Sequence, residues 1–136
     1  MENQVYEIEN KSKEIKLTVT VTTPGIATTE VKLFLSDGSI INKGHSTNGA
    51  GLISEVSIGI DTILNNSTIK IETYVQLSKI PKSAWESCYN NLQIHFYLNG
   101  GKGNQVISFE LLPNEKNKSS NGELISGIKR IDLINI

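Results

Sequence analysis

The sequence is short of the residues that catalytic and metal-binding sites most often use. It has one cysteine and two histidines, which excludes an intrachain disulfide and a zinc site built from cysteines. Arginine occurs only at Arg130, so the chain has only one side chain suited to bidentate binding of a phosphate group. The 13 basic and 14 acidic residues leave a net charge of −1, which argues against nucleic acid and anionic membranes as partners. We expect no cofactor and no metal.

Long apolar runs are also missing. No stretch approaches the roughly 18 apolar residues of a membrane-spanning helix, and the start of the chain, Met-Glu-Asn-Gln, has neither the basic nor the apolar part of a secretion signal. We therefore expect a cytoplasmic protein, with a secreted or periplasmic protein that has lost its signal as the alternative. Since 136 residues is the length of one ordinary domain, we expect a single domain over residues 1–136.

Alanine, the best helix former, occurs only three times, whereas the chain has 19 Ile, 7 Val and 10 Thr. β-branched residues pack well on pleated sheets and lose side-chain freedom in helices. Six segments alternate apolar and polar residues with a period of two, which is typical of half-buried strands. These segments are residues 15–22, 31–35, 56–60, 69–77, 92–98 and 107–111.

Two weaker strand candidates are residues 4–9 and 128–135. In the second, the apolar residues do not all fall on one face of a strand, which predicts a bulge near Lys129-Arg130. Glycine-rich residues 99–103 separate two strong strands and predict a hairpin loop. Residues 42–51 and 113–123 are polar and are expected to be loops, the second of them mobile.

Helical spacing occurs only over residues 81–91, where Trp85, Cys88 and Tyr89 fall on one face behind Pro81. The pattern predicts an all-β protein, an antiparallel β-sandwich of about eight strands with one short helical crossover at 81–91. A closed barrel is the alternative.

A strand–turn–strand pattern covers about thirty residues. Val31-x-Leu33 leads into Asp37-Gly38, and Thr47-x-x-x-Gly51 leads into an alternating strand that ends at Ile60. This pattern resembles bacterial immunoglobulin-like and prealbumin-like modules. The resemblance implies an immunoglobulin-like or prealbumin-like sandwich and assigns no functional residue.

Cys88 and His95 are the one nucleophile–base pair to consider, since they lie seven residues apart on the helical turn and the following strand. No Asp lies near in sequence to orient His95. Cys88 shares its helical face with Trp85 and Tyr89, as packing cysteines do. We expect Cys88 to be buried and unreactive, and a small Cys/His hydrolase is the least favoured function.

The most promising set of side chains is aromatic. If strands 69–77 and 92–98 pair, the side chains of their polar faces lie on one surface. These side chains are aromatic rings, an amide and a carboxylate, and the segment that connects the two strands adds a tryptophan. The candidate ligand or partner face consists of Tyr74, His95, Tyr97, Glu72, Gln93 and Trp85. Such rings can stack on sugars or anchor a partner protein, unless the helical crossover covers them as a second core layer.

We therefore expect a non-enzymatic protein-interaction or structural module that binds a protein partner or a second copy of itself. The alternative is a carbohydrate-binding module that uses the aromatic face. An exposed planar row of rings would favour sugar binding, and a large flat apolar patch would favour a protein partner.

Overall fold

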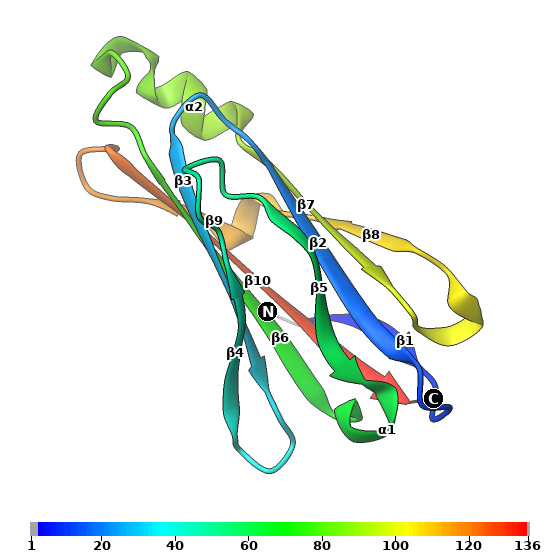
Figure 1. Cartoon of the computed structure of the whole chain (residues 1–136). Coiled ribbons are helices and arrows are strands. Elements are labelled where there is room, and N and C mark those ends of the chain that lie inside the picture. The colour runs from blue at the N-terminus through cyan, green and yellow to red at the C-terminus, as the bar shows by residue number, and fades with distance from the viewer. Residues whose placement is uncertain (1–2, 136) are drawn as a thin grey trace.

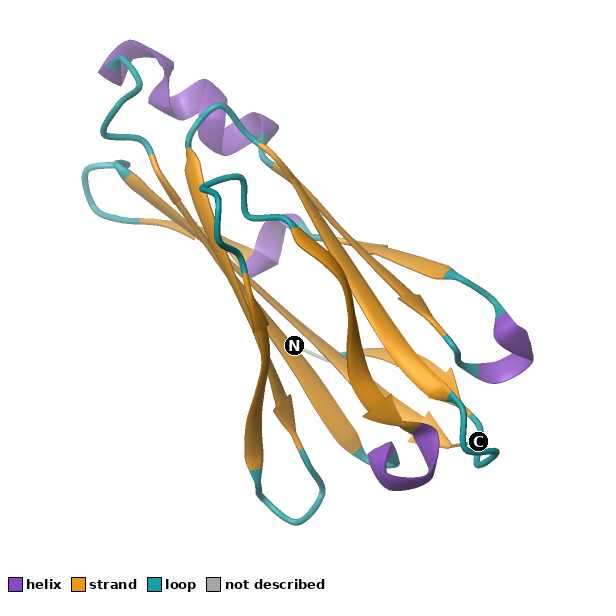
Figure 2. Ribbon diagram, in the orientation of Figure 1, coloured by secondary structure: helices purple, strands orange, loops and turns teal. Residues whose placement is uncertain are grey.

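The computed structural model describes residues 3–135 and is mostly β, with 56% of residues in strands and 15% in helices. Two sheets, of six and four strands, pack together as the two layers of the molecule (Figures 1 and 2). The expectation of a mostly β fold is confirmed, and the two packed layers are the coarse arrangement of a β-sandwich.

The six-stranded sheet contains both ends of the described chain. Its order is β1 (Gln4–Ile8), β10 (Leu124–Asn135), β6 (Ser67–Gln76), β3 (Ile26–Phe34) and β4 (Ile40–His45), with β9 (Lys116–Lys118) also beside β10. β1 runs parallel to β10, and the other pairs are antiparallel.

The four-stranded sheet has the order β5 (Ile53–Ile60), β2 (Glu14–Thr22), β7 (Gln93–Asn99) and β8 (Ile107–Glu110), all antiparallel. The chain passes from β6 in one sheet to β7 in the other through η1 (Lys82–Ala84) and α2 (Trp85–Asn91), as expected for a helical crossover over 81–91. In Figure 1 this segment lies across one end of the two sheets. Shorter helical turns are α1 (Asp61–Leu64), η2 (Lys102–Asn104) and η3 (Pro113–Glu115).

The core lies between the sheets, where the inward side chains of both layers are fully buried. Ile71 and Ile131 come from the six-stranded sheet, and Leu17 and Phe96 from the four-stranded one. Burial of this apolar surface contributes about 25 cal/mol per Å² and is the main favourable term in folding. Gly127 lets the layers approach, because a Cβ there would lie 2.8 Å from Leu111 Cδ2.

The bulge predicted near Lys129-Arg130 is wrong. β10 pairs with β6 in unbroken register from Leu124 to Leu133, and Lys129 occupies an inward position. Its side chain is 0% exposed, and its Nζ donates hydrogen bonds to Glu110 O at 2.8 Å and Glu115 Oε1 at 3.0 Å. The apolar residues do not keep one parity because Lys129 takes an inward position while Ile128 points to the outer face.

Two of the expected loops contain strands. Residues 42–51 overlap β4, which pairs with β3, and residues 113–123 contain η3 and β9. β9 is fastened to α2, since Tyr89 Oη donates to Lys116 O at 3.2 Å and Lys116 Nζ donates to Tyr89 O at 2.6 Å. Strands this short and polar carry no hydrophobic alternation to reveal them.

Candidate functional site

The aromatic face expected from the sequence does not exist as one surface. β6 pairs with β10 and β3, whereas β7 pairs with β2 and β8, so the assumed pairing of these two strands is wrong. Both strands do point the expected residues outward, but from different sheets and therefore on opposite faces of the molecule. The crossover through α2 explains the error, because it carries the chain from one layer to the other.

Tyr74 and Glu72 lie together on the outer face of the six-stranded sheet. Tyr74 is 38% exposed and its Oη donates to Glu72 Oε2 at 2.8 Å. This hydrogen bond is the main reason that the pKa of Glu72 is lowered and that the pKa of Tyr74 is raised. Glu72 Oε1 also lies 3.4 Å from Lys70 Nζ and 3.9 Å from Lys32 Nζ. The carboxylate is therefore engaged by its own neighbours.

His95, Tyr97 and Gln93 lie on the outer face of the four-stranded sheet. The rings of His95 and Tyr97 are parallel within 13°, with centroids 6.2 Å apart, and His95 Nδ1 lies 3.9 Å from Glu110 Oε1. Gln93 is exposed at the end of the strand. This face offers one aromatic pair, without the tyrosine and tryptophan that the sequence argument placed beside it.

Trp85 belongs to α2 and is partly buried against the core. Its Nε1 donates to Leu77 O at 3.0 Å and to Ile80 O at 2.9 Å. Because both acceptors precede η1, these bonds fasten the start of the helical segment to the end of β6. The ring is therefore held in one orientation at the end of the molecule.

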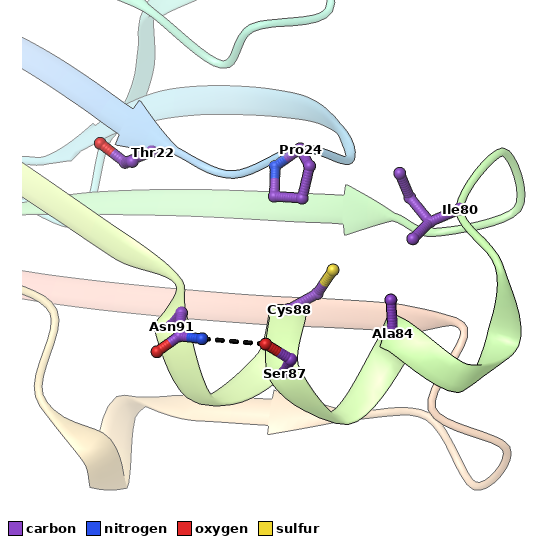
Figure 3. Close-up of a pocket in the computed structure, with 7 residues that line it drawn as sticks. All are labelled: Thr22, Pro24, Ile80, Ala84, Ser87, Cys88 and Asn91. Carbon is purple, nitrogen blue, oxygen red and sulfur yellow. Dashed lines mark hydrogen bonds between the residues drawn. The ribbon is translucent and has the colours of Figure 1, made fainter.

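An apolar pocket of about 320 Å³ opens beside the same helical segment (Figure 3). One wall is the helix face with Ala84 and Cys88, and the opposite wall is the turn between β2 and β3 with Pro24. Gly25 allows this turn to approach the core, because a Cβ there would lie 2.7 Å from Val75 Cγ1. The lining residues are Thr22, Pro24, Ile80, Ala84, Ser87, Cys88 and Asn91.

Cys88 is 6% exposed, which confirms the expectation that it is buried. Its sulfur points into the space between Pro24 and Ile80 in Figure 3. His95 does not line this pocket, because it faces Tyr97 and Glu110 on the outer face of the sheet. The structure therefore does not place Cys88 and His95, the nucleophile–base pair considered from the sequence, in one pocket.

A second pocket, of about 310 Å³, opens on the other flank of the helical segment. It combines Trp85 with two cations and with polar residues from the turn between β9 and β10. The lining residues are Lys82, Trp85, Glu86, Lys118, Asn121 and Gly122. Sequence reasoning missed both pockets, because each joins residues that are far apart in the chain. The helical spacing of 81–91 was the one signal for their shared wall.

Within residues 3–135, no group of three or more His, Cys, Asp and Glu side chains is arranged to hold a metal ion. The helices of that same part of the chain are all too short or too polar to cross a membrane. Comparison with protein families, curated proteins and solved structures gave no match to this chain.

Proposed function

We propose that this protein is a non-enzymatic interaction module that docks a protein partner at the end of its two sheets covered by α2. The partner inserts an aliphatic or aromatic side chain into the pocket of Cys88. The observation that carries this proposal is the pocket itself, a mostly apolar cavity of about 320 Å³ that is open to solvent.

The walls of the pocket are formed by elements that are held in place. Trp85 bonds two main-chain carbonyls at the start of the helical segment, and Tyr89 is bonded to β9 on its far side. Pro24 restricts the backbone of the facing turn, and Gly25 lets this turn lie close to Val75. A preformed pocket lowers the cost of ordering groups on binding, and hot spots of protein interfaces are typically anchor side chains in such pockets.

The polar groups of the pocket favour a protein anchor over a small molecule. Asn91 Nδ2 donates to Ser87 Oγ at 3.0 Å, so these two side chains partly satisfy each other at the rim. A small-molecule site usually has several convergent polar groups that fix the ligand's orientation. An anchor side chain needs none, because the surface around the pocket orients the partner.

Catalysis is not part of the proposal. The thiol of Cys88 is buried, and the residues that share its pocket include no histidine, carboxylate or lysine to act as its base. Nucleophilic catalysis requires such a base within hydrogen-bond reach or a strongly activated thiol.

A peptide selection tests the proposed function. Random peptides displayed on phage are selected against the immobilised protein, and the best are synthesised and titrated by calorimetry. We expect the peptides to share an aliphatic or aromatic residue. Ala84→Phe fills the pocket and should weaken their binding at least about tenfold, or about 1.4 kcal/mol.

The matched control is Thr20→Phe, which adds the same ring to the outer face of the four-stranded sheet opposite His95. It should leave peptide binding unchanged. Peptides that bind Ala84→Phe as tightly as the original protein would contradict the proposal. If Ala84→Phe instead dissociates a dimer of the protein, the occupant of the pocket is a second copy of this chain.

The finer type of the fold remains part of this proposal. An immunoglobulin-like or prealbumin-like sandwich would present its loops at the two ends, and the pockets beside α2 would then lie where such modules vary most freely. Any immunoglobulin-like or prealbumin-like domain offered as a match must contain the parallel pair that β1 and β10 form here.

A further inference from the structure

We propose that the pocket beside Trp85 binds an acidic saccharide, with a sugar ring against the indole and its carboxylate between Lys82 and Lys118. This inference rests on the opposite flank of α2 from the pocket of Cys88, and it stands or falls independently of the proposed protein partner.

The indole is prepared for stacking. Its Nε1 is already bonded to Leu77 O and Ile80 O, so binding costs Trp85 little side-chain freedom. Gly122 lies beside the ring, and a Cβ built on it would reach 4.0 Å from Trp85 Cε3, so a larger side chain here would extend toward the indole. The φ of Gly122 is 81°, a backbone conformation that favours glycine, so the turn itself favours a residue without a side chain at this position.

The charge of the pocket favours an anion. Lys82 and Lys118 both line it and are exposed, and within residues 3–135 neither forms an ion pair. Lys118 Nζ also lies 4.8 Å from the centroid of the Tyr89 ring, which belongs to the same helix as Trp85. Two cations against the single carboxylate of Glu86 leave a local positive charge in a chain whose net charge is −1.

The other lining groups fit sugar hydroxyls. Asn121 Oδ1 accepts hydrogen bonds from Ser119 Oγ and Glu123 N, both at 3.0 Å, which leaves its NH₂ group free to donate to a ligand. The Glu86 carboxylate can accept a hydrogen bond from a sugar hydroxyl. A phosphorylated nucleotide fits less well, because the pocket has no arginine and only one aromatic wall.

Trp85 is the only tryptophan of the chain and lines this pocket, so tryptophan fluorescence comes from a side chain at the proposed site. The full chain is titrated with trigalacturonate, and in parallel with maltotriose, a neutral trisaccharide, at equal ionic strength. We expect a saturable change in fluorescence with trigalacturonate that weakens as salt is added. Maltotriose should bind at least about tenfold more weakly.

The variant Lys82→Gln/Lys118→Gln should lose at least about tenfold in affinity for trigalacturonate. The control Lys43→Gln/Lys102→Gln removes the same charge away from the pocket and should keep the original affinity. Calorimetry with the same ligands provides a second readout that does not depend on the indole.

Three results would overturn the inference. They are no saturable response to trigalacturonate, equal affinity for maltotriose, and equal loss of affinity in the two double variants. Adenosine monophosphate serves as a further probe, and binding of this nucleotide without any binding of trigalacturonate would assign the pocket to another ligand class.

Discussion

Lys129 and the pair Lys82 and Lys118 show two opposite uses of the same side chain. Lys129 is fully buried between the layers, where Glu110 O and the Glu115 carboxylate accept its hydrogen bonds. Lys82 and Lys118 are exposed beside Trp85 at the end of the molecule. The first lysine joins parts of the fold, and the other two are available to a ligand.

The two environments separate lysines that stabilise the fold from lysines that can bind a ligand. A buried charge is costly unless it is paired and hydrogen-bonded, so a satisfied one is part of the folding problem. Exposed charges that lack a carboxylate partner contribute little to stability. Variants of the two groups should therefore change different measurements.

The largest effect is expected from Lys129→Met. It leaves the Glu115 carboxylate, 11% exposed, without its cation, and such a loss usually costs about 3–5 kcal/mol of the free energy of unfolding. Urea unfolding followed by circular dichroism measures it. Adding Glu115→Gln should restore much of the loss, because the buried charge is gone while an acceptor for Leu112 N remains. Equal stability of Lys129→Met and the original protein would refute the structural role.

A smaller loss is expected from Cys88→Ser. The new hydroxyl replaces a thiol in apolar surroundings and should cost roughly 1–3 kcal/mol if it finds no partner. The thiol of the native protein should also react more slowly with a maleimide than the thiol of the protein in urea, because Cys88 is only 6% exposed at the wall of its open pocket. Rapid labelling of the folded protein would show that Cys88 is accessible, and would reopen the question of a reactive thiol.

The pH dependence of stability should show a third arrangement, in which Lys11 and Lys13 pair with Glu9. Hydrogen bonds from Lys13 and then Lys11 lower the pKa of Glu9 to about 2 from its usual value of 4.5. Glu9 therefore stabilises the protein fully above pH 4.5, and this contribution disappears as the pH falls toward about 2. Glu9→Gln should flatten this part of the stability profile. An unchanged profile would mean that the ion pairs of Glu9 do not persist in solution.

The smallest effect on stability is expected from Lys82→Gln and Lys118→Gln. Lys82→Gln should change the free energy of unfolding by less than about 0.5 kcal/mol, as surface substitutions usually do, and Lys118→Gln by at most about 1 kcal/mol, because it also loses the contact with the Tyr89 ring. A larger loss in urea unfolding would mean that these cations support the fold, and would remove the contrast with Lys129.

The sequence was sufficient for most of the strands and for the crossover, but not for β4, β9 or the order of the strands in the sheets. Alternation predicted residues 69–77 and 92–98 as strands and placed Tyr74 and Tyr97 outward correctly, because side chains alternate along any strand. Alternation says nothing about which strand lies beside which. The two were therefore paired wrongly, and a single aromatic face was expected where the structure has two.

Other misses have similarly local causes. Lys129 occupies a core position that no hydrophobic pattern predicts, since its partners Glu110 and Glu115 come from elsewhere in the chain. The pockets are built from the β2–β3 turn, α2 and the β9–β10 turn, segments that only the fold brings together. Trp85 was the one expected site residue that lines either of them.

We propose that this protein binds its partner at the end covered by α2 and not on an outer sheet face. A two-dimensional amide NMR titration of the isotope-labelled protein with a peptide selected on it tests this claim most directly. We predict that the amide signals of Ile80, Ala84 and Cys88 shift while those of Tyr74 and Tyr97 do not. Shifts centred on Tyr74 or Tyr97, with α2 unaffected, would contradict the account.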